Sequence, residues 1–287
     1  MEKRERVTIG HIWGGIYPVI LYLFITMVAA FILLYIKHMI VISNDSVNIQ
    51  TINDNLSLII TFFGALITAP LLILIKYLDT RKQKMMGGYG YKSVFFAKYL
   101  FIIPFAVTFM YAANVFVNIL EIIIPSIAHS YDSTSKAIYG ADISIQIVTA
   151  VILGPIVEEL MFRGLMYIRF KRMFGAGASA FVTSLLFGIY HMNIAQGIYA
   201  FLFSYAAIFV YERYKKIYAP IIFHMVSNGV SVLVTFVFKD YNTSESVKNN
   251  LDAKTQIVSL IIICAISASL CALFALFIKK WVDPRKK

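Results

Sequence analysis

Eight long hydrophobic segments recur along the chain, and their length limits what it can fold into. A helix that crosses a bilayer needs about 20 apolar residues, and most of these segments reach that length. Because lipid offers no hydrogen bonds, a spanning backbone must form helices or a closed barrel. The sequence therefore predicts an all-α, polytopic membrane protein with about eight helices, over residues 14–36, 57–76, 93–120, 144–171, 177–191, 195–212, 217–238 and 256–279.

The composition favours a membrane protein over a soluble one. Hydrophobic residues make up 60% of the 287 residues and charged residues only 14%, with a mean hydropathy of +0.76. Soluble domains carry about 45–50% apolar and about 25% charged residues. The first apolar segment is too long for a signal peptide and lacks a small-residue cleavage site, so we interpret it as the first membrane helix. We expect a single membrane domain over residues 1–287, since no linker interrupts it.

The net charge of +11 indicates orientation rather than nucleic-acid binding. Cytoplasmic loops of membrane proteins carry an excess of Lys and Arg. If both termini are cytoplasmic, the polar loops 37–56, 121–143 and 239–255 lie outside, and nineteen basic residues lie inside against five outside. The inner set is Lys3, Arg4, Arg6, Lys76, Arg81, Lys82, Lys84, Lys92, Arg169, Lys171, Arg172, Arg213, Lys215, Lys216, Lys279, Lys280, Arg285, Lys286 and Lys287, and the outer set is Lys37, Lys136, Lys239, Lys248 and Lys254.

Two adjacent carboxylates, Glu158 and Glu159, lie within the apolar segment 144–171. Insertion scales put the cost of an ionisable group at the centre of a membrane helix at about 2.5–3.5 kcal/mol, so such a group usually has a partner and a task. Glu159 and Arg163 are four residues apart, share a helix face and are expected to pair. Glu158 points about 100° away from that pair, and we expect it to face a buried water and two histidines.

Two histidines occupy later apolar segments. His191 ends the pattern Phe187-x-x-x-His191, and His224 begins the pattern His224-x-x-x-Asn228. Counting residues from the basic clusters places all of these groups at mid-membrane depth, nearer the cytoplasmic side. A single histidine in a membrane helix is more often an interhelical hydrogen-bonding group than a catalyst. Three polar patterns that occur in order in three separate segments nevertheless favour one shared site.

These patterns resemble, in order, the three motifs of the CAAX protease and bacteriocin-processing family of intramembrane enzymes, also called CPBP or Abi. Glu158-Glu159-x-x-x-Arg163 is similar to the first motif, and the Phe-His and His-Asn patterns are similar to the second and third. The resemblance covers about residues 143–238, where it implies the catalytic core. It implies an intramembrane endopeptidase of the glutamic type that uses neither a metal nor another cofactor.

The resemblance also implies a role for each motif residue. Glu158 would be the general base, and His191 would help to hold and polarise the attacking water. His224 and Asn228 would donate hydrogen bonds to the oxyanion, a kind of contact that is worth several kcal/mol in a dry site. The supporting residues would be Glu159, Arg163 and Phe187.

Three other functions remain open at this point. Two histidines and one Glu could ligate zinc and leave the other Glu as the base, although the chain has no H-E-x-x-H motif and Asn is a poor zinc ligand. A non-catalytic scaffold or bacteriocin-immunity factor could bind a peptide or a sensor kinase. A transporter is a third alternative, but we see neither an inverted repeat nor paired broken helices.

The expected partners follow from the membrane location. They are the lipid bilayer and a membrane-associated peptide or protein substrate, with no nucleic acid. The Ile-, Lys- and Asn-rich composition indicates an AT-rich bacterium, so we expect a multi-pass protein of a bacterial cell membrane.

Overall fold

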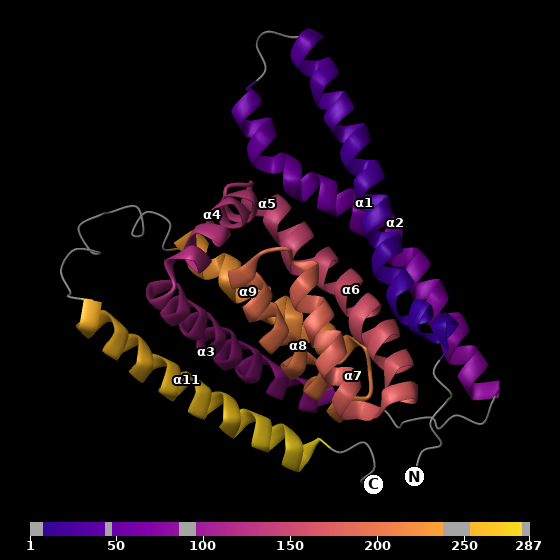
Figure 1. Ribbon diagram of the computed structural model, residues 1–287, viewed down its shortest axis with the longest axis vertical. Helices are drawn as coiled ribbons and strands as arrows, with labels where there is room; N and C mark the ends of the chain where they lie inside the picture. The colour runs from indigo at the N-terminus through magenta and orange to yellow at the C-terminus, as the bar shows by residue number, and fades with distance from the viewer. Residues whose placement is uncertain (1–7, 44–47, 86–95, 238–252, 283–287) are drawn as a thin grey trace. The chain divides into compact units, whose positions relative to one another are not determined.

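The computed structural model describes residues 8–43, 48–85, 96–237 and 253–282, and all regular structure in these ranges is helical (Figure 1). The predicted all-α fold is thus confirmed. Helices η2 and η3 are π-helices and η1 is a 3₁₀ helix. The elements are α1 (Ile9–Ser43), α2 (Ile49–Met85), η1 (Phe96–Phe101), α3 (Ile102–Ile123), α4 (Pro125–Tyr139), α5 (Ile143–Gln146), η2 (Ile147–Leu153), α6 (Gly154–Glu159), η3 (Leu160–Tyr167), α7 (Ile168–Tyr190), α8 (Ile194–Tyr214), α9 (Tyr218–Val237) and α11 (Ala253–Trp281).

Seven helical stretches within the described ranges are long and apolar enough to cross a membrane, as expected of a multi-pass integral membrane protein. The fourth and fifth expected segments lie together in one stretch, Ile143–Tyr190. Gly175 breaks the helix there, with φ 78° and ψ 173°, a conformation that glycine adopts without the steric cost of a Cβ. The break falls between 171 and 177, where the sequence predicts the boundary between two spans.

Two of the expected outer loops are largely helical. In the region 37–56, α1 continues to Ser43 and α2 begins at Ile49. In the region 121–143, the polar helix α4 was not predicted. Its Ile127 is buried in a cluster with Val117 of α3 and Ala195 of α8. This tertiary contact stabilises a helix whose polar composition predicts a loop. The third expected loop lies almost wholly in 238–252, outside the described residues.

The chain divides into two compact units, and the first comprises residues 1–90 and 135–183. Its helices α1 and α2 lie side by side (Figure 1). Helix η3 packs against both of them, and α6 packs against α2. Every side chain of η3 is buried, which is the pattern of a helix enclosed by protein on all sides.

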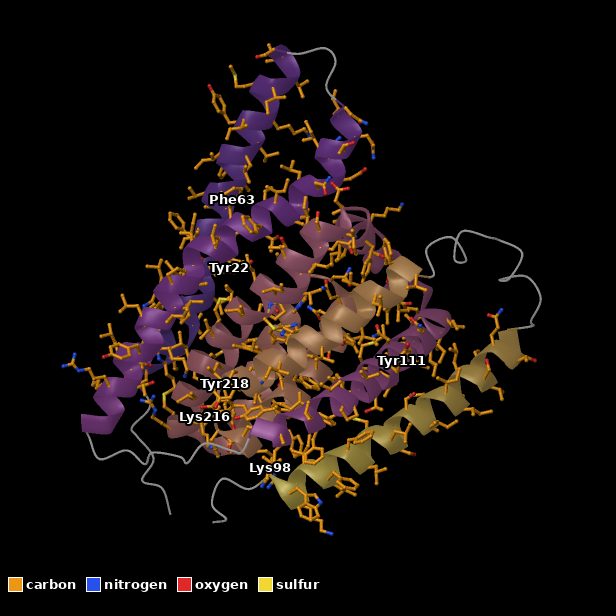
Figure 2. All side chains as sticks on the ribbon, turned by 180° about the vertical axis from the view of Figure 1, so that it is seen from behind. Tyr22, Phe63, Lys98, Tyr111, Lys216 and Tyr218 are labelled. Atoms are coloured by element: carbon orange, nitrogen blue, oxygen red, sulfur yellow. The ribbon has the colours of Figure 1, made fainter. Side chains whose placement is uncertain are left out.

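The second unit comprises residues 91–134 and 184–287. Its helices α3 and α11 run side by side (Figure 1), and α3 also packs against α8 and α9. Lys98 of η1 donates from Nζ to the carbonyl oxygen of Trp281 at the end of α11, 2.8 Å away, and it is visible there in Figure 2. The hydroxyl of Tyr214 donates to the carbonyl oxygen of Lys98 at 2.7 Å. These bonds tie the ends of three elements of the unit together.

Candidate active site

The two adjacent glutamates lie on α6, a helix of only six residues between the π-helices η2 and η3. At the first junction the Gly154 amide donates to the Thr149 carbonyl, five residues back. Pro155 follows at the start of α6 and has no amide proton, and a proline ring within a helix clashes with the carbonyl four residues back. A widened turn accommodates that clash. The structure shows π-helical turns on both sides of α6, and such turns are rare and often mark functional sites.

Glu159 and Arg163 form the predicted ion pair. Nη1 of Arg163 lies 2.8 Å from Oε1 of Glu159, and neither side chain is exposed. The Arg163 charge also interacts with the Glu158 carboxylate. A buried pair repays the cost of leaving water only when its geometry is good and its other polar atoms are also satisfied. The 2.8 Å contact supplies one strong bond toward that balance.

Glu158 differs from its neighbours on α6. Val157 and Glu159 are both fully buried, whereas Glu158 is half-buried. Adjacent helical residues point about 100° apart, so the two carboxylates face different surroundings, as the sequence predicts. One carboxylate serves the ion pair and the other is partly accessible.

His191 lies directly after the last residue of α7 and is held by the end of that helix. Its Nδ1 is 2.8 Å from the carbonyl oxygen of Phe187, and its amide donates to the carbonyl of Gly188 at 3.2 Å. A carbonyl oxygen only accepts hydrogen bonds, so Nδ1 carries the proton in this contact. In the neutral ring, Nε2 then presents a lone pair and acts as an acceptor.

The turn after α7 fixes the place of His191. Met192 has φ 50°, and Asn193 caps α8 by accepting from the Gln196 amide at 2.9 Å. Gly188 and Gly197 bring the two helix backbones together, because a Cβ on Gly188 would lie 2.8 Å from the Gly197 carbonyl oxygen. Small residues are what permit such close approach of membrane helices. An asparagine before an apolar segment is a recognisable cap signal, so the start of α8 at this turn could be found from the sequence.

The ring of Phe187 contacts both candidate histidines. Its centroid lies 4.8 Å from that of His191 and 6.3 Å from that of His224, and both contacts are edge-on. His224 lies on α9, is only 6% exposed, and has its ring 4.5 Å from that of Phe203 on α8. The second unit therefore brings the second and third motifs together around one aromatic ring. Phe203 is a neighbour that sequence reasoning missed.

Asn228 follows His224 by four residues in the continuous helix α9, so the two share a face about one turn apart. Asn228 is half-buried. Of the seven predicted site residues, the second unit thus holds Phe187, His191, His224 and Asn228, and the first holds Glu158, Glu159 and Arg163.

Among the described residues, no three His, Cys, Asp or Glu side chains gather as a metal-binding group.

Two comparisons relate the chain to known proteins. Residues 140–230 match the family model described as Type II CAAX prenyl endopeptidase Rce1-like. The chain is also similar to "Putative membrane peptidase YdiL" of Bacillus subtilis (strain 168), with 26% identity over 120 residues, which cover 42% of this chain and 46% of that protein. The match thus spans about half the length of that relative. No solved structure matches the chain.

The matched region contains all three motifs, from Glu158 to Asn228. It also contains α6, η3, α7 and most of α9, the elements that carry or border the candidate residues. The family expected from the motifs is the one that both comparisons indicate, and over residues 140–230 the chain is similar to the Rce1-like group of CAAX prenyl endopeptidases.

Proposed function

We propose that this protein is an intramembrane endopeptidase that hydrolyses a membrane-associated peptide or protein with a water activated by Glu158. The observation that carries the proposal is that one family match, residues 140–230, contains every motif residue in order. The similar B. subtilis protein is itself named as a membrane peptidase.

In this proposal the two glutamates have different roles, one structural and one catalytic. Glu159 is buried and paired with Arg163, so it braces the helix and neutralises the guanidinium. Glu158 is the more accessible carboxylate and is the base that accepts a proton from water. Its helix α6 lies between the π-helices η2 and η3. Because η3 is buried throughout, it anchors the helix that carries the base.

The hydrogen bond at Nδ1 of His191 supports the proposal that this residue binds the attacking water. Because Nδ1 bonds to the Phe187 carbonyl, Nε2 is left as an acceptor. A water that donates one hydrogen to Glu158 and the other to Nε2 points a lone pair toward the scissile carbonyl. The water oxygen then bonds to the carbonyl carbon, its proton passes to Glu158, and Glu158 delivers a proton to the departing amine as the C–N bond breaks.

His224 and Asn228 are the proposed donors to the oxyanion. The carboxamide of Asn228 offers two N–H donors and the imidazole of His224 at least one. His224 is almost shielded from solvent, and a donor in such surroundings stabilises developing charge far more than it would in water. We propose that no metal or other cofactor takes part.

A peptidase assay of the purified full chain tests this function. The protein is incubated in lipid vesicles with a library of membrane-anchored peptides, and its metal content is measured in parallel. We expect new peptide ends that appear at the same rate after exhaustive treatment with a chelator. Absence of cleavage across the library would favour the binding scaffold, and activity that tracks one bound zinc would favour the metalloprotease.

The mechanism also requires Glu158 to meet His191, which belongs to the other unit. In a background with Cys264→Ser and Cys271→Ser, Glu158→Cys and His191→Cys are treated with a short bifunctional thiol reagent, and the cross-linked peptides are identified by mass spectrometry. The matched control pairs Glu158→Cys with Ile189→Cys, an exposed position on α7. Cross-linking of the control pair alone would contradict the proposed site.

A further inference from the structure

Four charged side chains gather in the first unit away from the motif residues. Lys76 and Asp79 lie near the end of α2, and Arg169 and Arg172 lie in the first turns of α7. We refer to Lys76, Asp79, Arg169 and Arg172 as the α2–α7 basic cluster. It holds three cations and one carboxylate.

Arg169 uses the one carboxylate of the cluster. Its Nε donates to Oδ2 of Asp79 at 2.8 Å, and its Nη1 donates to the carbonyl oxygen of Gly14 on α1. Its guanidinium also lies 5.2 Å from the centre of the Tyr17 ring. Arg169 thus has partners on α1 and α2 and serves as a structural link.

Lys76 has a partner that brings no negative charge. Its Nζ donates to the carbonyl oxygen of Gly164 in η3 at 3.1 Å, and its side chain is half-buried. The ammonium group interacts electrostatically with Asp79, Arg169 and Arg172. With Asp79 bound to Arg169, the surroundings of Lys76 carry an excess of positive charge.

The guanidinium group of Arg172 contains a hydrogen-bond donor, Nη2, for which no acceptor is described. Its Nη2 is buried and has no hydrogen-bond partner among the described residues. Buried polar groups in native proteins are nearly always hydrogen-bonded, so each exception asks for an explanation. The excess of basic residues in cytoplasmic loops explains solvated charges, but it does not explain a buried guanidinium nitrogen.

We propose that the α2–α7 basic cluster binds a phosphate group, which Arg172 and Lys76 contact. A guanidinium fork and an ammonium group are the side chains that recognise phosphate oxygens in proteins. The phosphate belongs either to the headgroup of an anionic lipid or to a free ion. The cluster lies where the sequence places the cytoplasmic membrane surface, and anionic headgroups at that surface attract basic side chains.

The unfolding temperature of the full chain in detergent tests the proposal. Phosphatidylglycerol, phosphatidylcholine or inorganic phosphate is added, and a ligand bound to the folded state raises the midpoint by about 3–5 °C at saturating concentration. A rise with phosphatidylglycerol alone identifies the lipid headgroup as the source. An equal rise with inorganic phosphate identifies the free ion, and a rise with neither, or an equal one with phosphatidylcholine, overturns the proposal.

Variants assign the effect to the cluster. Arg172→Gln and Lys76→Gln are each expected to lose at least half of the rise, whereas Arg81→Gln keeps it. Arg81 is exposed and lies two residues beyond Asp79, about 200° around α2. If Arg172→Gln fails to fold, Arg172→Lys gives the same test because it keeps the charge and loses the fork. A full rise in both Arg172→Lys and Lys76→Gln would overturn the assignment.

Discussion

Arg163 and Glu159 meet in the interior of the first unit, with Nη1 and Oε1 2.8 Å apart and neither side chain exposed to solvent or lipid. One α-helical turn separates them in sequence, and the helices α1 and α2 enclose the π-helix that carries Arg163. The pair is therefore part of the fold that holds Glu158, and removing one member leaves a charge buried without its partner.

Loss of Arg163 is expected to destabilise the protein. Truncation of one member of a buried ion pair costs about 3–5 kcal/mol, so Arg163→Ala should lower the folded yield and the unfolding midpoint in detergent. Arg81→Ala, at an exposed position, is the matched control and should unfold as the wild type does. An Arg163→Ala protein that is inactive yet unfolds normally would show instead that Arg163 contacts substrate.

The orientation of the chain is a second prediction. The excess of basic residues in one set of loops predicts that both termini lie in the cytoplasm. A reporter fused after residue 287 and a single cysteine in 239–255 should therefore respond from opposite sides of the membrane. Labelling of both from the same side would contradict the orientation. A cysteine-free protein with the same fusion controls for background labelling.

The tautomer of His191 is a third prediction. Because its Nδ1 bonds to a carbonyl oxygen, the neutral ring should carry its proton on Nδ1 and none on Nε2. Nitrogen-15 NMR of the histidine-labelled protein distinguishes the two nitrogens, and the His191→Gln protein identifies the resonances. A neutral ring protonated on Nε2 would remove the proposed acceptor for the attacking water.

The expected oxyanion donors give a fourth prediction. His224→Ala and Asn228→Ala should each lower kcat by about 10²–10³, the usual loss for one such donor. KM should change much less, because the donors act on charge that develops in the transition state. Ser231→Ala is the control, one further turn along α9, where its hydroxyl donates to the Ser227 carbonyl. Equal rates for the wild type and both variants would contradict the assignment.

Local features of the chain could be predicted from the sequence. The membrane helices follow from the length of the apolar segments, and the Glu159–Arg163 pair follows from a spacing of four residues. The break at Gly175 falls in a Gly-Ala-Gly sequence between two expected segments. In each case the residues that decide the structure lie within one turn or one segment of each other.

Features set by packing could not be predicted. The π-helix η3 is buried on every side, so its hydrophobicity carries no periodic signal that distinguishes helical types. Helix α4 is polar and depends on the contact of Ile127 with α3 and α8. The contact of Phe187 with both His191 and His224 joins helices α7 and α9, and no local pattern encodes which ring lies between them.

The cleavage rate of the Glu158→Gln protein tests the central claim most directly. This change keeps the shape of the side chain and removes the base, so the reconstituted variant should unfold like the wild type and show no cleavage of any peptide that the wild type cuts. Glu159→Gln is the matched control and should affect stability more than the chemical step. Cleavage by Glu158→Gln at the wild-type rate would contradict the account.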